Sequence, residues 1–247
     1  MKAPLAVVSG GTRGNGWAFT DRLVHMGHNV AVLYHADEAA ANKVAEAHPG
    51  RVHPFRVDVT DPRQVDEFAD HVLAVHGPPS VLVNNAGAAV DKPLLELTDK
   101  DWRTVLDTNL SGAFHLIRAF AGAMLASGGG TVVNVVTTDG FRRKPAGAGH
   151  AASKAGLLQL TKSAATELAP TVRVNALSPG LTDSEETRTR LRLDDPDRLA
   201  GVLAQIPQRR LGSPTDVADA LEFLVGPASR YLTGQQLVVD GGHLMQQ

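Results

Sequence analysis

The feature that most constrains this 247-residue chain is a glycine-rich stretch near its start, residues 9–16, which reads Ser-Gly-Gly-Thr-Arg-Gly-Asn-Gly. An apolar run, Leu5–Val8, precedes this stretch, and a helix-compatible run, Trp17–Met26, follows it. A strand that turns directly into a helix leaves backbone N–H groups unpaired, and these groups bind anions with help from the helix dipole. Glycine lets a pyrophosphate approach the backbone without meeting a Cβ. The expected binding residues are Gly10, Thr12, Arg13, Gly14, Asn15 and Gly16.

An ordinary glycine-rich turn is the alternative interpretation, because the spacing Gly-x-x-x-Gly-x-Gly is neither the Gly-x-Gly-x-x-Gly fingerprint nor a Walker loop. The position of the stretch between a first strand and a first helix favours the binding site.

Short apolar runs alternate with longer helical patterns along the whole chain. Most of these runs are continuously apolar, which is typical of strands covered by helices on both faces, and the alternation indicates a parallel sheet with right-handed crossovers. Because no linker or repeat interrupts the pattern, we predict one doubly wound, Rossmann-like α/β domain over residues 1–247. The expected strands are Leu5–Ser9, Asn29–Tyr34, Val52–Val57, Val81–Asn84, Thr131–Val136, Val172–Leu177 and Gln236–Val239.

Capping residues predict several helix ends. Asp61 and Ser213 each precede a proline, and Thr98 precedes an acidic turn, so each is expected to cap a helix N-terminus. A long helix is expected from near Asp101 to the glycines that begin at Gly128.

Composition restricts the classes of partner and chemistry. The net charge of −2 argues against nucleic acid or an anionic membrane as the main partner, and the absence of cysteine excludes disulfides and thiol catalysis. No apolar run reaches the ~18 residues of a membrane span, and the N-terminus lacks a signal-peptide layout. We therefore expect a soluble, cytoplasmic protein. The ten histidines are scattered, so no metal site is expected.

The loops that follow the strands are the expected ligand site, because doubly wound sheets bind ligands beyond the C-terminal strand ends. After the third strand, Asp58 and Val59 are placed to meet an adenine. After the fourth, the small residues of Asn84–Gly87 allow close approach of a ribose. The loops after the fifth and sixth strands contribute Thr137, Pro179, Gly180 and Thr182.

These motifs, taken in order, resemble the short-chain dehydrogenase/reductase superfamily. The glycine pattern, the Asn-Asn-Ala-Gly of residues 84–87, a Ser153–Lys154 pair that opens a helix, Pro179–Gly180 and the tail of residues 233–242 occur at family spacing. The chain is similar to the single-domain type that includes bacterial ketoacyl and polyketide ketoreductases, from about residue 4 to about residue 245. The resemblance implies a nicotinamide cofactor held in part by Asn85, Ala86, Gly87, Lys154 and the backbone of Thr182.

The residues near the expected ribose favour NADPH over NADH. An NAD enzyme usually carries an acid at the end of the second strand, but this strand ends Tyr34-His35, and Asp37 beyond it is expected to cap the next helix. In relatives that use NADPH, the positions of Arg13 and His35 carry bases that meet the 2′-phosphate. A solvated turn residue is the alternative interpretation of Arg13.

The resemblance also implies a catalytic set, from which this chain departs at one position. In the family, a tyrosine protonates the carbonyl, a lysine four residues later binds the ribose, a serine orients the carbonyl and an asparagine supports a water relay. This chain retains Lys154 and Asn109, and it has Thr137 at the serine position. The tyrosine position is occupied by His150, and neither Tyr34 nor Tyr231 can replace it.

Three interpretations of His150 remain open. The imidazolium, whose unperturbed pKa is about 6.5, is itself a competent acid, although the Lys154 ammonium is expected to lower its pKa. Alternatively, an ordered water or the substrate supplies the proton. In the third interpretation, reduction is lost and the chain serves as a non-redox cyclase or dehydratase, a sensor or a scaffold. We favour a working reductase of a ketone or quinone-like carbonyl, on a polyketide or another secondary metabolite.

Three further features lead to predictions. The basic run Arg142–Lys144 is either a solvated face or a site for an anionic partner, such as a carrier protein that bears the substrate. The charge-rich residues 182–206 have the composition of a substrate lid. A homodimer or homotetramer is expected from the resemblance alone.

Overall fold

The computed structural model describes residues 3–138 and 146–246. The chain alternates strands and helices: β1 (Leu5–Ser9), α1 (Gly14–His25), β2 (Asn29–Tyr34), α2 (Glu38–Ala47), β3 (Val52–Arg56), α3 (Pro62–Val75), β4 (Val81–Asn84), α4 (Asp99–Leu106), α5 (Gly112–Ala126), β5 (Gly130–Val135), α6 (Ala148–Leu168), β6 (Val172–Pro179), α7 (Glu185–Leu191), α8 (Pro196–Ala204), α9 (Pro214–Val225) and β7 (Gln236–Val239). Short 3-10 turns lie at Leu94–Glu96, Pro227–Ser229 and His243–Gln246.

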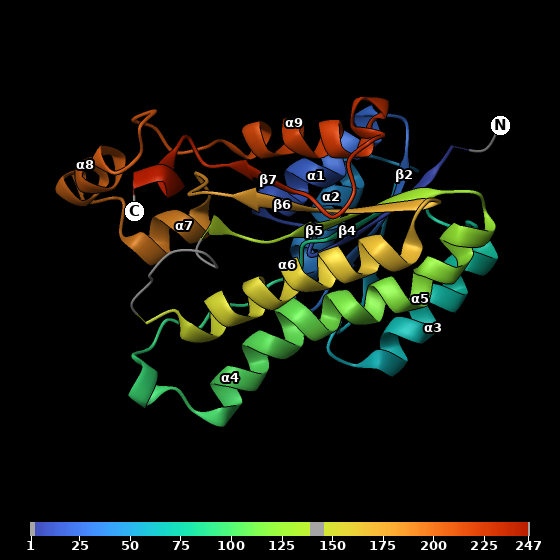
Figure 1. Cartoon of the computed structure of the whole chain (residues 1–247), viewed down its shortest axis with the longest axis horizontal. Coiled ribbons are helices and arrows are strands. Elements are labelled where there is room, and N and C mark those ends of the chain that lie inside the picture. Colours follow the sequence, from blue (N-terminus) through green and yellow to red (C-terminus); the bar gives the residue numbers. More distant parts are fainter. Residues whose placement is uncertain (1–2, 139–145, 247) are drawn as a thin grey trace.

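The seven strands form one parallel sheet in the order β3-β2-β1-β4-β5-β6-β7 (Figure 1). Each strand lies parallel to its neighbour, as in the register of Ser9 with both Leu33 and Asn84. The sheet therefore presents all its C-terminal strand ends at one edge, and the strand order reverses at β1 and β4. The predicted Rossmann-like fold class is confirmed.

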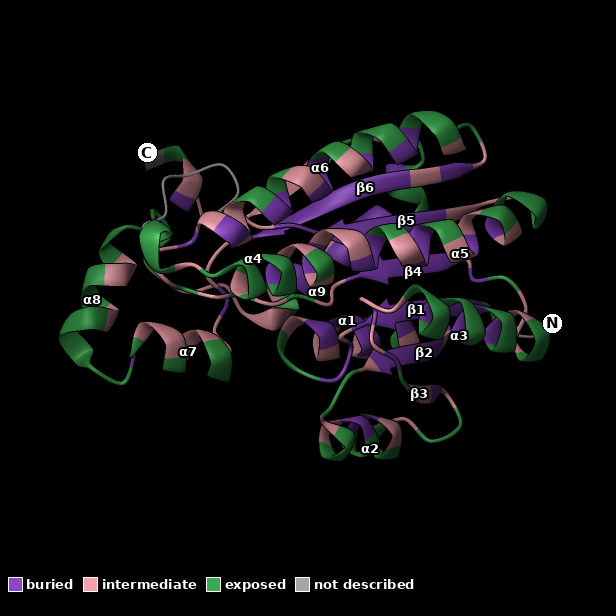
Figure 2. Ribbon diagram, turned by 90° about the horizontal axis from the view of Figure 1, so that it is seen from below, coloured by how far each residue is buried: buried purple, intermediate pink, exposed green. Residues whose placement is uncertain are grey.

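Helices cover both faces of the sheet (Figure 2). One core lies between the sheet and α3, α5 and α6, and it contains Phe68 and Phe120, whose rings meet edge to face. The other lies between the sheet and α1, α2 and α9, and it contains Phe19 and Leu221. The central strands are buried on both faces, which explains why their sequences are continuously apolar.

The predicted caps are confirmed. Asp61 accepts a hydrogen bond from Arg63 N, and Thr98 and Ser213 each form a reciprocal capping box with the aspartate three residues later. Asp37 caps α2 by accepting from Ala40 N at 3.0 Å, as expected.

Several predicted boundaries were wrong by a few residues. β3 ends at Arg56, β5 shifts back by one residue to Gly130–Val135, and β6 continues to Pro179 because Ser178 and Pro179 pair with β7. The first helix begins at Gly14 rather than Trp17, inside the glycine-rich stretch.

Two predicted helices differ more clearly from the structure. The long helix expected from Asp101 is divided into α4 and α5 by a π-helical turn at Asp107–Ser111. The helix that the Ser153–Lys154 pair was expected to open begins earlier, at Ala148, so the pair lies in its second turn. Both differences occur beside the cleft described below.

Candidate active site

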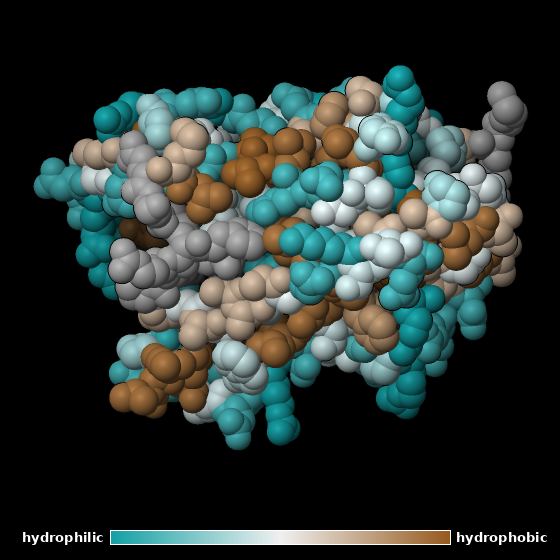
Figure 3. All heavy atoms as spheres, in the orientation of Figure 1, coloured by the Kyte–Doolittle hydropathy of each residue, from teal (hydrophilic) through white to brown (hydrophobic). Residues whose placement is uncertain are grey.

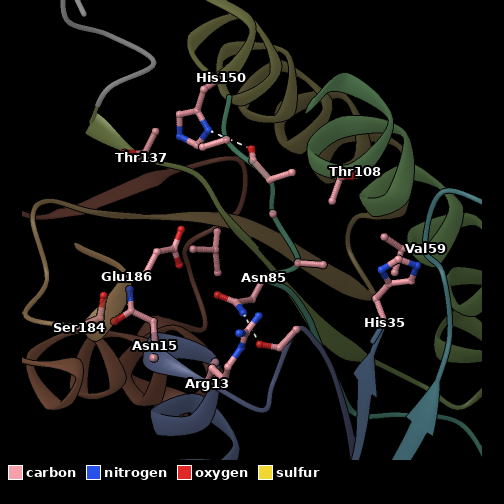
Figure 4. A pocket seen from close by; sticks show the side chains of 18 of the residues that line it. Arg13, Asn15, His35, Val59, Asn85, Thr108, Thr137, His150, Ser184 and Glu186 are labelled. Carbon is pink, nitrogen blue, oxygen red and sulfur yellow. Dashed lines mark hydrogen bonds between the residues drawn. The ribbon is translucent and has the colours of Figure 1, made fainter. Parts of the chain in front are cut away.

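The C-terminal edge of the sheet opens into a cleft of about 1870 Å³ (Figure 4). The loops after β1, β2, β3, β4, β5 and β6 all contribute to its lining, as the switch-point rule predicts. Every candidate site residue of the sequence analysis lines this cleft except Asn109, which lies buried behind it.

The glycine-rich turn forms one end of the cleft. Gly10 adopts a φ of 63°, which an L side chain rarely adopts, and a Cβ on Gly16 would overlap the carbonyl oxygen of Gly10. The Thr20 hydroxyl donates to the carbonyl oxygen of Gly11 at 2.9 Å and fixes the turn against α1. Asn15 Oδ1 is buried and has no hydrogen-bond partner among the described residues. This cradle, with a helix N-terminus and an unsatisfied polar atom, fits the pyrophosphate of a dinucleotide.

The charged residues of the expected adenosine region lie close to one another. The Arg13 guanidinium is 3.5 Å from the Asp37 carboxylate, so Asp37 both caps α2 and faces Arg13. His35 Nε2 lies 3.7 Å from Asp58 Oδ2. The other oxygen of Asp58 accepts from the backbone and the hydroxyl of Thr60, which orients the carboxylate at the end of β3.

The end of β4 is bound to the end of β1 across the switch point. The Ser9 hydroxyl accepts from the backbone N–H groups of Asn85 and Ala86, at 3.0 and 3.1 Å. The Asn85 amide donates back to the carbonyl oxygens of Ser9 and Gly10. These bonds hold residues 85–87 beside the glycine-rich turn, where small side chains leave space for a ribose.

Asn109 lies in the π-helical turn and clamps the segment that follows Gly87. Its Oδ1 accepts from Ala88 N at 2.7 Å, and its Nδ2 donates to Ala88 O at 3.0 Å and to Ser153 Oγ at 2.9 Å. Both amide hydrogens are therefore used. A water relay through Asn109 stays a prediction, and the second lone pair of Oδ1 is the capacity that these bonds leave for it. The π-helical turn occurs where this buried side chain must reach two elements, as such turns often do at functional sites.

Lys154 extends from α6 toward the cleft with its side chain almost wholly buried, at 5% exposure. Its Nζ donates to the carbonyl oxygen of Val135, at the end of β5, at 2.7 Å. A Cβ on Gly87 would lie 3.8 Å from this Nζ and 3.4 Å from Asn109 Oδ1, so the loop after β4 packs on both groups. Burial lowers the pKa of Lys154 to about 8.

His150 and Thr137 face the same region of the cleft (Figure 4). His150 lies one turn before Lys154 on α6, which places the two side chains on one face of the helix. Its Nδ1 lies 3.4 Å from Ala88 O, so the ring rests against the segment that Asn109 clamps. Thr137 follows β5 and is partly exposed. The imidazole of His150 and the hydroxyl-bearing side chain of Thr137 therefore both line the cleft.

The opposite wall is formed by the loop after β6 and by α7. Gly180 N donates to Val239 O, and Thr182 pairs with Gly212, which fixes the start of residues 182–206. Ser184 caps α7 and, with Glu186, faces Asn15 across the cleft (Figure 4).

The basic run at 142–144, with its expected anionic partner, lies outside the described residues.

Sequence reasoning missed the roles of Ser153 and Ser9. The Ser153 hydroxyl accepts from Asn109 and donates to His150 O at 2.8 Å, so it joins the two candidate catalytic elements. The signal that could have indicated Ser153 is its position directly before Lys154, because a hydroxyl there lies on the part of the helix that packs against the sheet. No local signal pointed to Ser9, because its partners lie 76 and 77 residues away.

Neither a metal cluster nor a membrane span is found within residues 3–138 and 146–246. No three histidine, aspartate or glutamate side chains in this part of the chain are placed to hold a metal ion. No helix in it is long and apolar enough to cross a bilayer.

Comparisons with known proteins agree with this geometry. A family model described as enoyl-(acyl carrier protein) reductase matches residues 10–243. The 3-oxoacyl-[acyl-carrier-protein] reductase of Staphylococcus epidermidis is 36% identical over 244 residues, which cover 97% of this chain and 98% of the relative. The enzyme of the same name from Salmonella typhimurium is 34% identical over 246 residues, 99% of each chain.

A solved structure, gluconate 5-dehydrogenase from Burkholderia cenocepacia in complex with NADP and tartrate, superposes with a TM-score of 0.91. It is 28% identical, and the match covers 99% of this chain and 96% of that one. Fold, cleft geometry and relatives agree, and the chain belongs to the short-chain dehydrogenase/reductase superfamily of NAD(P)H-dependent oxidoreductases.

Proposed function

We propose that this protein is an NADPH-dependent ketoreductase that reduces the ketone of a 3-oxoacyl-type substrate, on a carrier protein or as a smaller molecule. The observation that carries the proposal is the placement of His150 and Lys154 on one face of α6, beside a dinucleotide cradle. Relatives about 35% identical over the whole chain bear the name of a 3-oxoacyl reductase, which supports this substrate class. Reduction of a ketone in a polyketide, or of a quinone-like carbonyl, is the same hydride transfer on a larger substrate.

The cofactor would be held by three parts of the cleft. The glycine-rich turn and Asn15 would bind the pyrophosphate, Asp58 and Val59 would face the adenine, and Lys154 would donate to the nicotinamide ribose. The loop that contains Pro179, Gly180 and Thr182 would support the nicotinamide from the other side. When bound, the reduced nicotinamide supplies a hydride to the carbonyl carbon.

The chain's own groups would supply the positioning and the proton. Thr137 would donate a hydrogen bond to the carbonyl oxygen, and His150 would protonate the alkoxide as hydride arrives. Asn109 and Ser153 would hold the Ala88 segment and α6 in register, so that the His150 ring stays beside the carbonyl. The Lys154 ammonium would keep the ribose in place and stabilise negative charge that develops nearby.

NADPH preference is supported by Arg13, which lies in the glycine-rich turn with its guanidinium exposed, and by the NADP in the related gluconate dehydrogenase structure. His35 would add a second positive contact when protonated. Asp37 opposes both, because its carboxylate lies 3.5 Å from Arg13. The selectivity that we propose is therefore moderate and depends on the balance of these charges.

Two further proposals concern the assembly and the lid. Residues 182–206 would act as the substrate lid, because α7, which they contain, lines the cleft. A homodimer or homotetramer would cover exposed apolar side chains on α4 and α5, among them Trp102, Phe114 and Leu125. Figure 3 shows apolar surface along this face of the molecule.

The proposal is tested by NADPH oxidation with acetoacetyl-pantetheine, followed at the absorbance of the reduced cofactor. The wild type is expected to consume NADPH in proportion to added ketone, and His150→Phe is expected to lose about 10²-fold or more in kcat if the imidazole supplies the proton. His150→Tyr restores the family's acid and should retain activity. The exposed His25→Phe is the matched control.

Two outcomes would contradict the proposal. Tight NADPH binding without turnover on a broad carbonyl panel would favour the non-redox alternative, in which the chain is a cyclase, a dehydratase, a sensor or a scaffold. Undiminished turnover by His150→Phe would show that water or the substrate supplies the proton. A fluorescence titration with NADPH and NADH separates the binding question from the chemistry.

A further inference from the structure

Arg190 lines the cleft from α7 and is incompletely paired. Its side chain is 28% exposed, and its Nη1 lies 3.9 Å from Asp91 Oδ2, beyond hydrogen-bond distance. Its Nε is buried and has no hydrogen-bond partner among the described residues. Arg188, two residues earlier on α7, is fully paired by comparison, because it donates to both carboxylate oxygens of Asp183, at 2.5 and 2.8 Å.

The position of Arg190 connects it with the reacting end of the cleft. Asp91 lies three residues after Ala88, whose carbonyl oxygen contacts the His150 ring. Arg190 therefore spans from the expected lid to the loop that carries this contact. Glu186, on the preceding turn of α7, also lines the cleft, and its carboxylate points into it (Figure 4).

An arginine whose N–H donors are only partly paired can bind an anion. A guanidinium presents donors in a planar fork that matches a carboxylate or a phosphate. A buried N–H without a partner lowers the stability of the folded chain until a ligand or a rearrangement satisfies it. The Asp91 carboxylate is close enough to Arg190 to offset part of the desolvation cost of its positive charge. At 3.9 Å it is too far to accept a hydrogen bond from the guanidinium.

We infer that Arg190 binds an anionic oxygen group of the substrate, either a carboxylate on a small keto acid or the phosphate of a phosphopantetheine arm. The inference rests on the proposed reductase function and names the substrate class of that site. A keto acid carries its carboxylate next to the reacting ketone, whereas a thioester on a carrier arm is neutral there and has its negative charge on the distant phosphate.

Three substrates with the same ketone distinguish these sources: acetoacetate, acetoacetyl-pantetheine and acetoacetyl-4′-phosphopantetheine. Only the first carries a carboxylate, only the third carries a phosphate, and the second is neutral. Arg190→Met is compared with the wild type on each by initial rates with NADPH. Arg198→Met is the control, because Arg198 is an exposed arginine of the same lid region that does not line the cleft.

Arg190→Met is expected to lower kcat/KM by at least about 10-fold on one anionic substrate, and by less than about 2-fold on the neutral one. A loss on acetoacetate identifies the carboxylate, and a loss on the phosphorylated thioester identifies the phosphate. Arg190→Lys keeps the charge but not the fork, so it should recover only part of the loss. An equal loss on all three substrates, or no loss on any, overturns the inference.

A binding measurement keeps the inference testable if the wild type reduces none of the three substrates, a result that would refute the proposed function instead. Calorimetric titration of the NADPH-loaded protein with acetoacetate and with phosphopantetheine then compares the wild type with Arg190→Met. Weaker binding of one anion by at least about 10-fold supports the role of Arg190. Equal binding by the two proteins, or no binding by either, overturns it.

Discussion

Replacing Lys154 with methionine is expected to stabilise the folded protein at neutral pH, although Lys154 lies at the centre of the proposed site. Burial lowers the pKa of this lysine from 10.5 to about 8, and the lowering corresponds to about 3 kcal/mol of folded-state stability lost by holding the ammonium at pH 7. Methionine removes that cost but also removes the Nζ donor to Val135 O, which offsets about 1–2 kcal/mol. We expect a net gain of about 1–2 kcal/mol in unfolding free energy.

The pH dependence of this gain is the sharper prediction. Because the pKa of Lys154 is lower in the folded chain than in the unfolded chain, the unfolded chain binds more protons between pH 8 and pH 10.5. The unfolding free energy of the wild type therefore rises with pH in that window relative to the variant. The advantage of Lys154→Met should shrink by about 2 kcal/mol between pH 7 and pH 9.5.

Urea unfolding followed by circular dichroism measures both quantities. The wild type and Lys154→Met are compared at four pH values from 7 to 9.5, without cofactor and at one protein concentration, so that any oligomer contributes equally. Lys162→Met, which removes an exposed lysine from the same helix, controls for the lost charge. A constant difference between the wild type and Lys154→Met across this range would refute the reasoning that the ammonium is desolvated in the folded chain.

Three further substitutions test the parts of the site. Gly16→Ala places a Cβ on Gly10 O, so it should weaken NADPH binding at least about 10-fold in a fluorescence titration; unchanged affinity would show that the turn does not hold the pyrophosphate. Asp37→Asn removes the carboxylate beside Arg13 and should raise the NADPH-over-NADH binding ratio by about 5-fold, whereas a fall in that ratio would exclude the assigned role of Arg13. Ser153→Ala leaves a buried amide N–H of Asn109 without its acceptor and should cost about 1–3 kcal/mol in urea unfolding; a neutral effect would mean that Asn109 finds another acceptor.

The sheet could be predicted from sequence because its signals are local. Continuous apolar runs bounded by glycine, proline or a capping residue predicted seven strands, and their alternation with helices predicted that the strands are parallel. The errors arose where pairing partners are distant. β6 extends through Ser178 and Pro179 because β7, which begins 57 residues after Pro179, supplies the pairing. The few residues around Ser178 and Pro179 contain no information on a pairing strand that lies so far along the chain.

The site was predicted as a set of residues but not as a network. The start of α6 was missed because its first residues, Ala148 and Gly149, follow Gly147 and lack a side-chain cap. The π-helical turn was missed because nothing within Asp107–Ser111 requires it; the turn accompanies the contacts of Asn109 with Ala88 and Ser153. Helical periodicity predicts a regular helix wherever a distant contact does not intervene.

The energetics of the cleft support the proposal that the chain reduces a carbonyl although His150 occupies the position of the family's tyrosine. The chain buries an ammonium at Lys154 with a strongly lowered pKa, an arrangement that an apolar side chain would relieve. The chain also fixes the backbone of Ala88, which contacts Asn109 Oδ1, Asn109 Nδ2 and His150 Nδ1. A scaffold that only binds partners gains nothing from a desolvated ammonium beside a cleft, whereas a hydride-transfer site does, because the charge acts most strongly where water is excluded. The cost at Lys154 is therefore best explained by a cofactor and a developing negative charge that offset it.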